Sequence, residues 1–392
     1  MLSVIALVLV GAAFGPFGSC TQSLLAQRGP VDWHAQPSRA RLTPAAAQEE
    51  RYLYVALPGS DAVDSDRSVR ILVFDIARNH RFVRRIPVWP AGVGGDAEVV
   101  RGTAASARAG RLFISTTSRL AAIDLQTERI VWERRYDSRC CDRLAVSPDG
   151  RTIYAPAFGS PKWYVIDAAT GELRAAIAVT GWPRDTVYAR DGKHAYLAAW
   201  ESAVLSISDT ARHAVVKEVG PFSASLCAFA LNAAGTLAFA NVDGLVGFEV
   251  GDLQTGLILD RVAADGFDQR AAADYECPSH GIAFTPDQRE LWVADGVQNR
   301  LQVFDASVYP PVARTTVDLP DQPRWIAFSI DGRYAYSSTG DVIGAAEKNI
   351  IGALEDAAGA KVVSEHFVEI DFVERRPVRS TERSLMSRML YP

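Results

Sequence analysis

Short runs of alternating apolar and polar residues, separated by turn residues, recur along most of this chain. One unit runs from Leu144 to Val179 and reads LAVSPDGRTIYAPAFGSPKWYVIDAATGELRAAIAV. It contains four short apolar runs, with Pro-Asp-Gly after the first and Ala-Thr-Gly before the last. Asp-Gly between alternating apolar runs is a strong hairpin signal. The unit therefore predicts a four-stranded antiparallel sheet.

The chain contains seven copies of this unit, and an aromatic residue marks the second strand of each copy. These aromatics are Tyr54, Phe113, Tyr154, Tyr196, Phe239, Trp292 and Tyr336, with gaps of 59, 41, 42, 43, 53 and 44 residues. Acidic residues follow on the third strand at Asp75, Asp124, Asp167, Asp209, Glu249 and Asp305. A period of about 40–45 residues with four strands per unit is typical of a β-propeller. We predict an all-β, seven-bladed β-propeller with the aromatics packed between blades.

The first and last copies indicate how the ring closes. The first copy begins with its aromatic strand, Tyr52–Leu57, and no inner strand is recognisable before it. Near the other end, Phe367–Phe372 reads FVEIDF, which alternates apolar and acidic residues as a strand does. We expect this C-terminal strand to complete the first blade. The propeller then spans residues 51–373, and residues 374–392 form a C-terminal tail.

The N-terminus has a different composition. Residues 1–17 read MLSVIALVLVGAAFGPF, an apolar run without charge that resembles the core of a secretory signal. We predict a signal peptide over residues 1–26, a flexible linker over 27–50 and an extracytoplasmic location, periplasmic or surface-anchored. Phe17-Gly18-Ser19-Cys20 resembles a lipobox, so lipidation of Cys20, cleavage near Ala26 and an uncleaved anchor all stay open. Membrane contact is expected only through this N-terminal segment.

Charge and cysteine content narrow the classes of partner and bond. The formal net charge is −5, and the basic residues form no stripe, so the sequence does not favour nucleic-acid binding. Besides Cys20 the chain has Cys140, Cys141, Cys227 and Cys277, and an exported protein can oxidise them. We predict a disulfide between Cys227 and Cys277 on neighbouring blades. A ring formed by the adjacent pair Cys140–Cys141, or four free thiols, stays open.

Aligning the copies on the turn that follows each first strand identifies a candidate site. The residue seven positions before the turn acid is Asp142, Arg184, His280 or Arg324 in four copies, and Cys227 and Gly102 in two others. Inner strands of a propeller line its channel, so these side chains should ring one opening. Arginine presents a planar donor fork for carboxylate or phosphate, and histidine titrates near neutral pH. The ring predicts an anion-binding mouth. The structural alternative is an Asp142–Arg184 pair with His280 capping nearby backbone.

Motifs for catalysis and cofactors are not found in the sequence. The histidines show no ligand spacing, and there is no CxxC, no haem-type CxxCH, no phosphate-binding glycine loop and no GxSxG. We therefore assign no catalytic residue, no metal and no cofactor.

The repeats resemble the YVTN-repeat β-propellers, the family that includes YncE-like proteins and subunits of some quinoprotein dehydrogenases. The resemblance covers residues 52–372 and rests on the segments LAVSPDGRTIYAP, YVIDAATGELRAAIAV, HGIAFTPDQRELWVAD and WIAFSIDGRYAYSSTGDVI. Ser364-Glu365-His366 also resembles the segment that closes YncE-like rings. The name-giving Tyr-Val-Thr-Asn is degraded here. The resemblance implies seven blades and export, and it implies no single activity.

Two classes of function follow. The first is a binding or scaffold module for a partner protein or a small anionic ligand. The second is an enzyme or a subunit of one, either a lactonase-like hydrolase or the partner subunit of a quinoprotein dehydrogenase. A vicinal disulfide beside the cofactor of some quinoprotein propellers links Cys140–Cys141 to the second class by resemblance alone. A metal or cofactor in the purified protein would favour that class.

Overall fold

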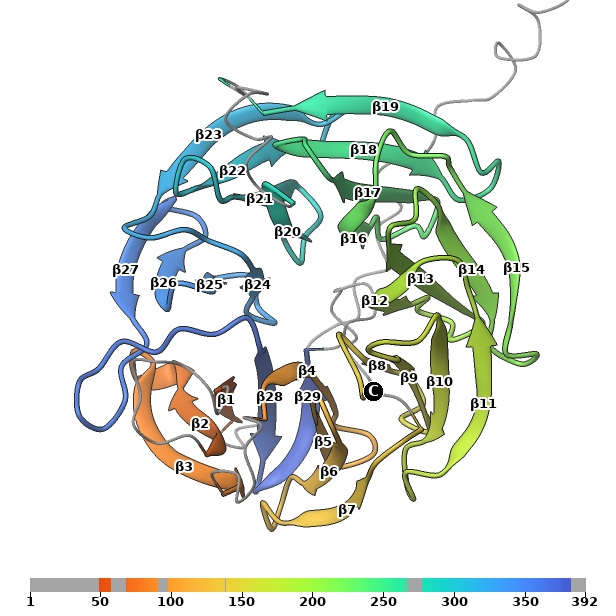
Figure 1. Ribbon diagram of the computed structural model, residues 1–392. Helices are drawn as coiled ribbons and strands as arrows, with labels where there is room; N and C mark the ends of the chain where they lie inside the picture. The colour runs from red at the N-terminus through yellow and green to blue at the C-terminus, as the bar shows by residue number, and fades with distance from the viewer. Residues whose placement is uncertain are drawn as a thin grey trace, which may run out of the picture.

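A computed structural model describes residues 49–57, 68–90, 98–137, 139–264, 266 and 277–381. The predicted signal peptide, Cys20 and nearly all of the predicted linker lie outside these residues. Seven antiparallel sheets surround a central axis in chain order (Figure 1). The prediction of an all-β seven-bladed propeller is confirmed. Among the described residues, no helix is long and apolar enough to cross a membrane.

The strands of each blade follow one another outward from the axis, apart from blade 1. Blade 1 holds β29 (Arg376–Ser380), β28 (Phe367–Val373), β1 (Glu49–Leu57), β2 (Val69–Asp75) and β3 (Arg81–Trp89), with a 3-10 turn η1 (Ile76–Arg78). Blade 2 holds β4 (Val100–Ser106), β5 (Arg111–Thr116), β6 (Leu120–Asp124) and β7 (Ile130–Arg134). Blade 3 holds β8 (Ala145–Val146), β9 (Thr152–Pro156), β10 (Lys162–Asp167) and β11 (Leu173–Ala178). Blade 4 holds β12 (Trp182–Tyr188), β13 (His194–Trp200), β14 (Leu205–Asp209) and β15 (Ala214–Val219).

The remaining three blades repeat the pattern. Blade 5 holds β16 (Leu226–Leu231), β17 (Leu237–Val242), β18 (Gly247–Asp252) and β19 (Ile258–Ala263). Blade 6 holds β20 (Ser279–Phe284), β21 (Glu290–Asp295), β22 (Arg300–Asp305) and β23 (Val312–Asp318). Blade 7 holds β24 (Ile326–Phe328), β25 (Tyr334–Ser337), β26 (Asp341–Gly344) and β27 (Asn349–Ala353).

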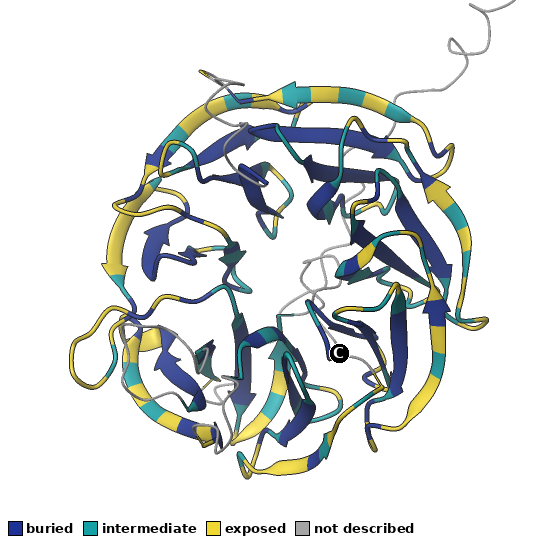
Figure 2. Cartoon of the chain, viewed as in Figure 1, coloured by how far each residue is buried: buried dark blue, intermediate teal, exposed yellow. Residues whose placement is uncertain are grey.

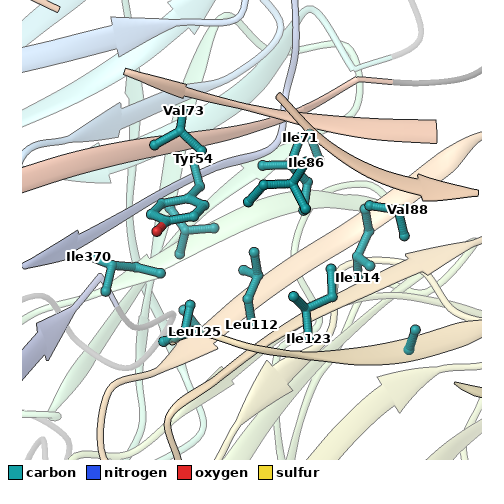
Figure 3. Packing of buried hydrophobic residues seen from close by; sticks show 14 of the residues in the cluster. Tyr54, Ile71, Val73, Ile86, Val88, Leu112, Ile114, Ile123, Leu125 and Ile370 are labelled. Carbon is teal, nitrogen blue, oxygen red and sulfur yellow. The ribbon is translucent and has the colours of Figure 1, made fainter. Parts of the chain in front are cut away.

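Burial follows the position of a strand in its blade. The outermost strands alternate exposed and covered residues, whereas the middle strands are almost wholly buried (Figure 2). An apolar cluster fills each interface between neighbouring blades, and Figure 3 shows the one between blades 1 and 2, where Tyr54 and Ile370 meet Leu112 and Ile114. All seven predicted aromatics are buried, so their assignment to the core is confirmed.

The third-strand acids close the turn into the fourth strand. In Asp124, Asp167 and Asp209, the first carboxylate oxygen accepts backbone N–H groups two and three residues ahead. In the fifth copy the predicted acid, Glu249, lies on the third strand β18 as expected, but it does not close the turn. Asp252 makes the same two bonds, at 2.7 and 3.0 Å, whereas Glu249 lies inside β18 and pairs with Arg261.

The C-terminal strand closes the ring as predicted. β28 pairs antiparallel with β1 and supplies the inner strand that the first repeat lacks. β29 pairs with β28, so a further strand lies inside the range that the sequence assigned to a tail. Ser380 of β29 accepts a hydrogen bond from the Ala107 amide of blade 2 at 3.1 Å. The two ends of the propeller are therefore joined by a full ladder of backbone hydrogen bonds.

The two faces of β28 differ in chemistry. Val368, Ile370 and Phe372 pack into the apolar cluster with blade 2. Glu369 and Asp371, almost fully buried, point to the blade 7 side and form the closure cluster with Arg51 of β1 and Asp331 of blade 7. Arg51 lies 2.7 Å from Glu369, 2.6 Å from Asp331 and 3.7 Å from Asp371.

Candidate functional site: the mouth of the central channel

A cavity of about 150 Å³ lies at the centre of the ring. Six of the seven blades contribute residues of their inner strands, and blade 3 contributes Arg143 just before β8. Its wall is mainly apolar. Polar side chains gather at the end where the inner strands begin, which is the channel mouth.

The structure brings Arg184 and His280 together at this mouth. Arg184 near the start of β12 donates from Nη2 to His280 Nε2 of β20 at 3.1 Å. Blade 5 lies between the two blades, so the arginine side chain reaches across part of the opening. Arg184 also lies over the Trp200 ring, 5.6 Å from its centroid. Because arginine cannot accept a hydrogen bond, His280 Nε2 is the acceptor and the ring proton is on Nδ1.

Arg324 pairs with Glu365, a carboxylate that the alignment of the repeats does not identify. Its Nε lies 3.0 Å from Glu365 Oε1, and Nη2 of Arg143 lies 2.6 Å from Glu365 Oε2. Arg143 of blade 3 also stacks on Trp325 of blade 7, 4.2 Å from the ring centroid, and so crosses the channel. Arg143, Arg184, His280, Arg324 and Glu365 are called the mouth cluster below.

The electrostatics of the mouth cluster show an excess of positive charge. Burial alone would raise the pKa of Glu365, but Arg143, His280, the adjacent His366 and Arg324 lower it to about 2. Burial and the neighbouring charge of Arg143 lower the pKa of Arg184, and the same two causes hold the pKa of His280 well below its usual range. At neutral pH His280 is therefore an uncharged hydrogen-bond acceptor that orients Arg184.

Asp142 lies beside the mouth cluster and hydrogen-bonds locally. Its carboxylate accepts the Arg143 amide at 3.0 Å, and burial raises its pKa against the attraction of Arg143 and Arg184. Arg101 of blade 2 lies over the Phe158 ring at 4.6 Å, and its Nε is buried without a hydrogen-bond partner. Four guanidinium groups thus stand near the opening.

Two glycines allow the backbone to approach closely at the mouth. A Cβ on Gly281, next to His280, would lie 2.9 Å from the Trp325 Cα and 3.1 Å from the Arg324 carbonyl oxygen. A Cβ on Gly102 would lie 2.8 Å from the Asp142 carbonyl oxygen. Each blade therefore presses directly on the chain that carries its neighbour's charged residues.

Four cysteines near the mouth form two disulfides. Cys227 at the start of β16 is joined to Cys277 just before β20, with Cα atoms 5.8 Å apart, so the bond links blades 5 and 6. Cys140 and Cys141 form a vicinal disulfide, fully buried, immediately before Asp142 and Arg143. Ser115 of blade 2 donates to the Cys141 carbonyl oxygen at 2.7 Å and holds this segment.

Sequence reasoning missed Arg143 and Glu365 for different reasons. Arg143 follows Asp142, the residue that the repeat alignment selects in the third copy. Because the alignment compares only one residue per copy, it misses a neighbour whose long side chain reaches the channel. Glu365 precedes β28, which joins β1 by pairing and not through a hairpin turn. Blade 1 therefore has no Asp-Gly turn on which to align its inner strand. The sequence does contain one indication of Glu365, because this residue lies just before the strand that closes the ring, where the other inner strands carry their mouth residues.

The donor set and the comparisons give no further assignment. Within the described ranges, no group of three or more His, Cys, Asp and Glu residues is placed to hold a metal ion. No family model and no curated protein matches this chain.

Proposed function

We propose that this chain is an exported, YVTN-type β-propeller that acts as a binding module and takes a small anionic ligand at its channel mouth. The observation that carries the proposal is Arg184. It is half-buried, and its described contacts are His280 and the Trp200 ring, neither of which is an anion. A desolvated guanidinium without a carboxylate contact favours binding of a ligand anion.

The cluster is organised before a ligand arrives. Trp200 and His280 fix the plane of Arg184 and leave its Nε and Nη1 as donors. Arg324 contacts Glu365 through Nε, and 59% of its side chain is exposed. Little side-chain entropy is lost when such donors bind, which favours affinity.

Calorimetric titration with sodium acetate and inorganic phosphate tests this proposal. We expect saturable binding of at least one anion, and Arg184→Gln should weaken it about tenfold or more, because hydrogen bonds to charged groups contribute about 1.5–3 kcal/mol. Arg174→Gln is the matched control, since Arg174 lies half-exposed on the outer strand β11. Absence of binding, or equal loss in both variants, would overturn the anion site and leave a partner protein as the ligand.

The vicinal disulfide favours a second candidate, a subunit of a redox enzyme. Cys140–Cys141 lies within three residues of Arg143, which lines the cavity. The absorption spectrum of the purified protein distinguishes the two. A stoichiometric cofactor band above about 300 nm would support the enzyme class, and a spectrum of aromatic residues and disulfides alone would support the binding module.

A further inference from the structure

The cavity beneath the mouth cluster is lined mainly by apolar residues, which binding of an anion alone does not require. Its lining includes Phe229, Ile282, Phe284, Ile326 and Phe328 of three successive inner strands, whose side chains are almost fully buried in the apolar clusters between blades and present only a small apolar surface to the cavity. Its volume, about 150 Å³, equals that of engineered apolar cavities that bind benzene. The channel therefore has room for a compact apolar group directly below the arginines.

Small residues at one register set the width of this channel. Ala230 of β16, Ala283 of β20 and Ala327 of β24 all line the cavity, and each is half-buried between fully or largely buried neighbours. All three lie four residues before the turn position on which the repeats are aligned in the sequence, so they occupy equivalent places in their blades. A methyl group at this level leaves open the space that a larger side chain would fill.

Arg143 connects the apolar channel to the charged mouth. It lines the cavity and also pairs with Glu365 in the mouth cluster. At the other end the lining includes Gln288 and Thr381, which are neutral, and Glu369, whose oxygens bind Arg51 and the Ile330 amide. The free positive charge is consequently at the mouth end alone.

The charges at the mouth favour a single negative charge on the ligand. Arg101, Arg143, Arg184 and Arg324 interact with three carboxyl groups, Asp142, Glu365 and the buried Asp185 of β12, and one positive charge is left when all three are ionised. One carboxylate balances this excess, whereas a phosphate dianion would leave a buried negative charge unpaired.

We propose that the ligand is a monocarboxylate with a compact apolar body about the size of a benzene ring. The body lies in the central channel, and the carboxylate lies at Arg143 and Arg184. This inference rests on the proposed function, and it adds the class of ligand and the part of the molecule that selects it.

Titration with phenylacetate, acetate and phenyl phosphate tests the ligand class. Because burial of a ring removes on the order of 100 Å² of apolar surface from water, phenylacetate should bind at least tenfold more tightly than acetate. Phenyl phosphate at pH 8 should bind more weakly than phenylacetate. If acetate binds and phenylacetate binds no better, the channel inference is overturned while the anion site stands. If neither binds, the proposed function itself fails.

A channel-filling variant tests where the body lies. Ala283→Phe fills part of the channel and leaves every arginine in place. The affinity for phenylacetate should therefore fall to that for acetate, while the affinity for acetate should not change. Ala358→Phe, on an exposed outer loop, is the matched control. Ala327→Phe, at the equivalent position of the next blade, repeats the test if Ala283→Phe does not fold by circular dichroism. Unchanged phenylacetate binding in a folded channel variant would overturn the inference.

Discussion

Two clusters of arginine and carboxylate in this propeller have opposite electrostatic character. In the mouth cluster, Arg143 and Arg324 both pair with one carboxylate, Glu365, and the pKa of Glu365 falls to about 2. In the closure cluster, Arg51 contacts Glu369, Asp331 and Asp371, and Arg379 of β29 pairs with Asp371 at 2.8 Å, so two arginines face three carboxyl groups. Burial there raises the pKa of Glu369 to about 8 against the attraction of Arg51.

The number of cations for each carboxylate explains the difference. Excess cations hold Glu365 ionised and leave donors over for a ligand anion, so the mouth suits binding. Excess carboxylates at the closure retain a proton between them, because two buried carboxylates at close range do not both ionise easily. The closure cluster therefore joins β28 to blade 7 and has no capacity for a further anion.

The largest effect should come from removing the cation of the closure cluster. Arg51→Met leaves buried Glu369 without its guanidinium, whereas Asp371 keeps Arg379, and we expect a loss of about 3–5 kcal/mol in the free energy of unfolding at pH 8. The loss should be smaller at pH 5.5, where protons can replace the cation. Urea denaturation at both pH values measures it.

Arg78→Met is the control for this prediction. Arg78 pairs with Asp75 at 3.5 Å in the same blade, but 63% of its side chain is exposed, so the change should cost about 1 kcal/mol or less. Equal losses in the two variants would show that the closure cluster behaves as a surface ion pair.

Glu369→Gln should remove a pH dependence. An unfolded glutamate releases its proton near pH 4.5, whereas folded Glu369 holds it to about pH 8, so in this window the folded state binds more protons and stability falls as pH rises. Glutamine stays neutral, and the variant should gain about 2 kcal/mol on the wild type between pH 5.5 and 8. Exposed Glu374→Gln should follow the wild type. If the free energies of unfolding of Glu369→Gln and of the wild type change with pH in parallel, the raised pKa of Glu369 is contradicted.

The same substitution at the mouth should have the opposite sign and a smaller size. The folded pKa of Glu365 is about 2, below its unfolded value, so its contribution to stability is present above pH 4.5 and is lost as pH falls toward 2. Because a quarter of this side chain is exposed, Glu365→Gln should cost about 1–2 kcal/mol at pH 7. It should also tighten acetate binding several-fold. A variant that is more stable at pH 7 would contradict the assignment.

The sequence predicts the blades well because each blade is a local pattern. The spacing of Tyr154, Tyr196 and Trp292 to the acids that follow them gives strand order and turns without long-range information. Glu249 shows the limit of local patterns, since only the hydrogen bonds of Asp252 distinguish the turn acid from an acid inside the strand.

The mouth is less predictable because its contacts cross the ring. The register finds Arg184, His280 and Arg324, yet pairing between Arg143 and Glu365 depends on residues 222 positions apart. The closure cluster joins Arg51 to Glu369, 318 positions away, and no local pattern encodes which carboxylate shares a cation. Such contacts follow only after the ring is closed.

A crystal structure of the protein grown with 4-bromobenzoate would locate both ends of the ligand, because the anomalous signal of bromine marks its apolar end. We predict bromine inside the channel near Ala283 and Ala327, with the carboxylate at Arg143 and Arg184. Bromine at another position, or an empty channel at a saturating concentration of ligand, would contradict the account.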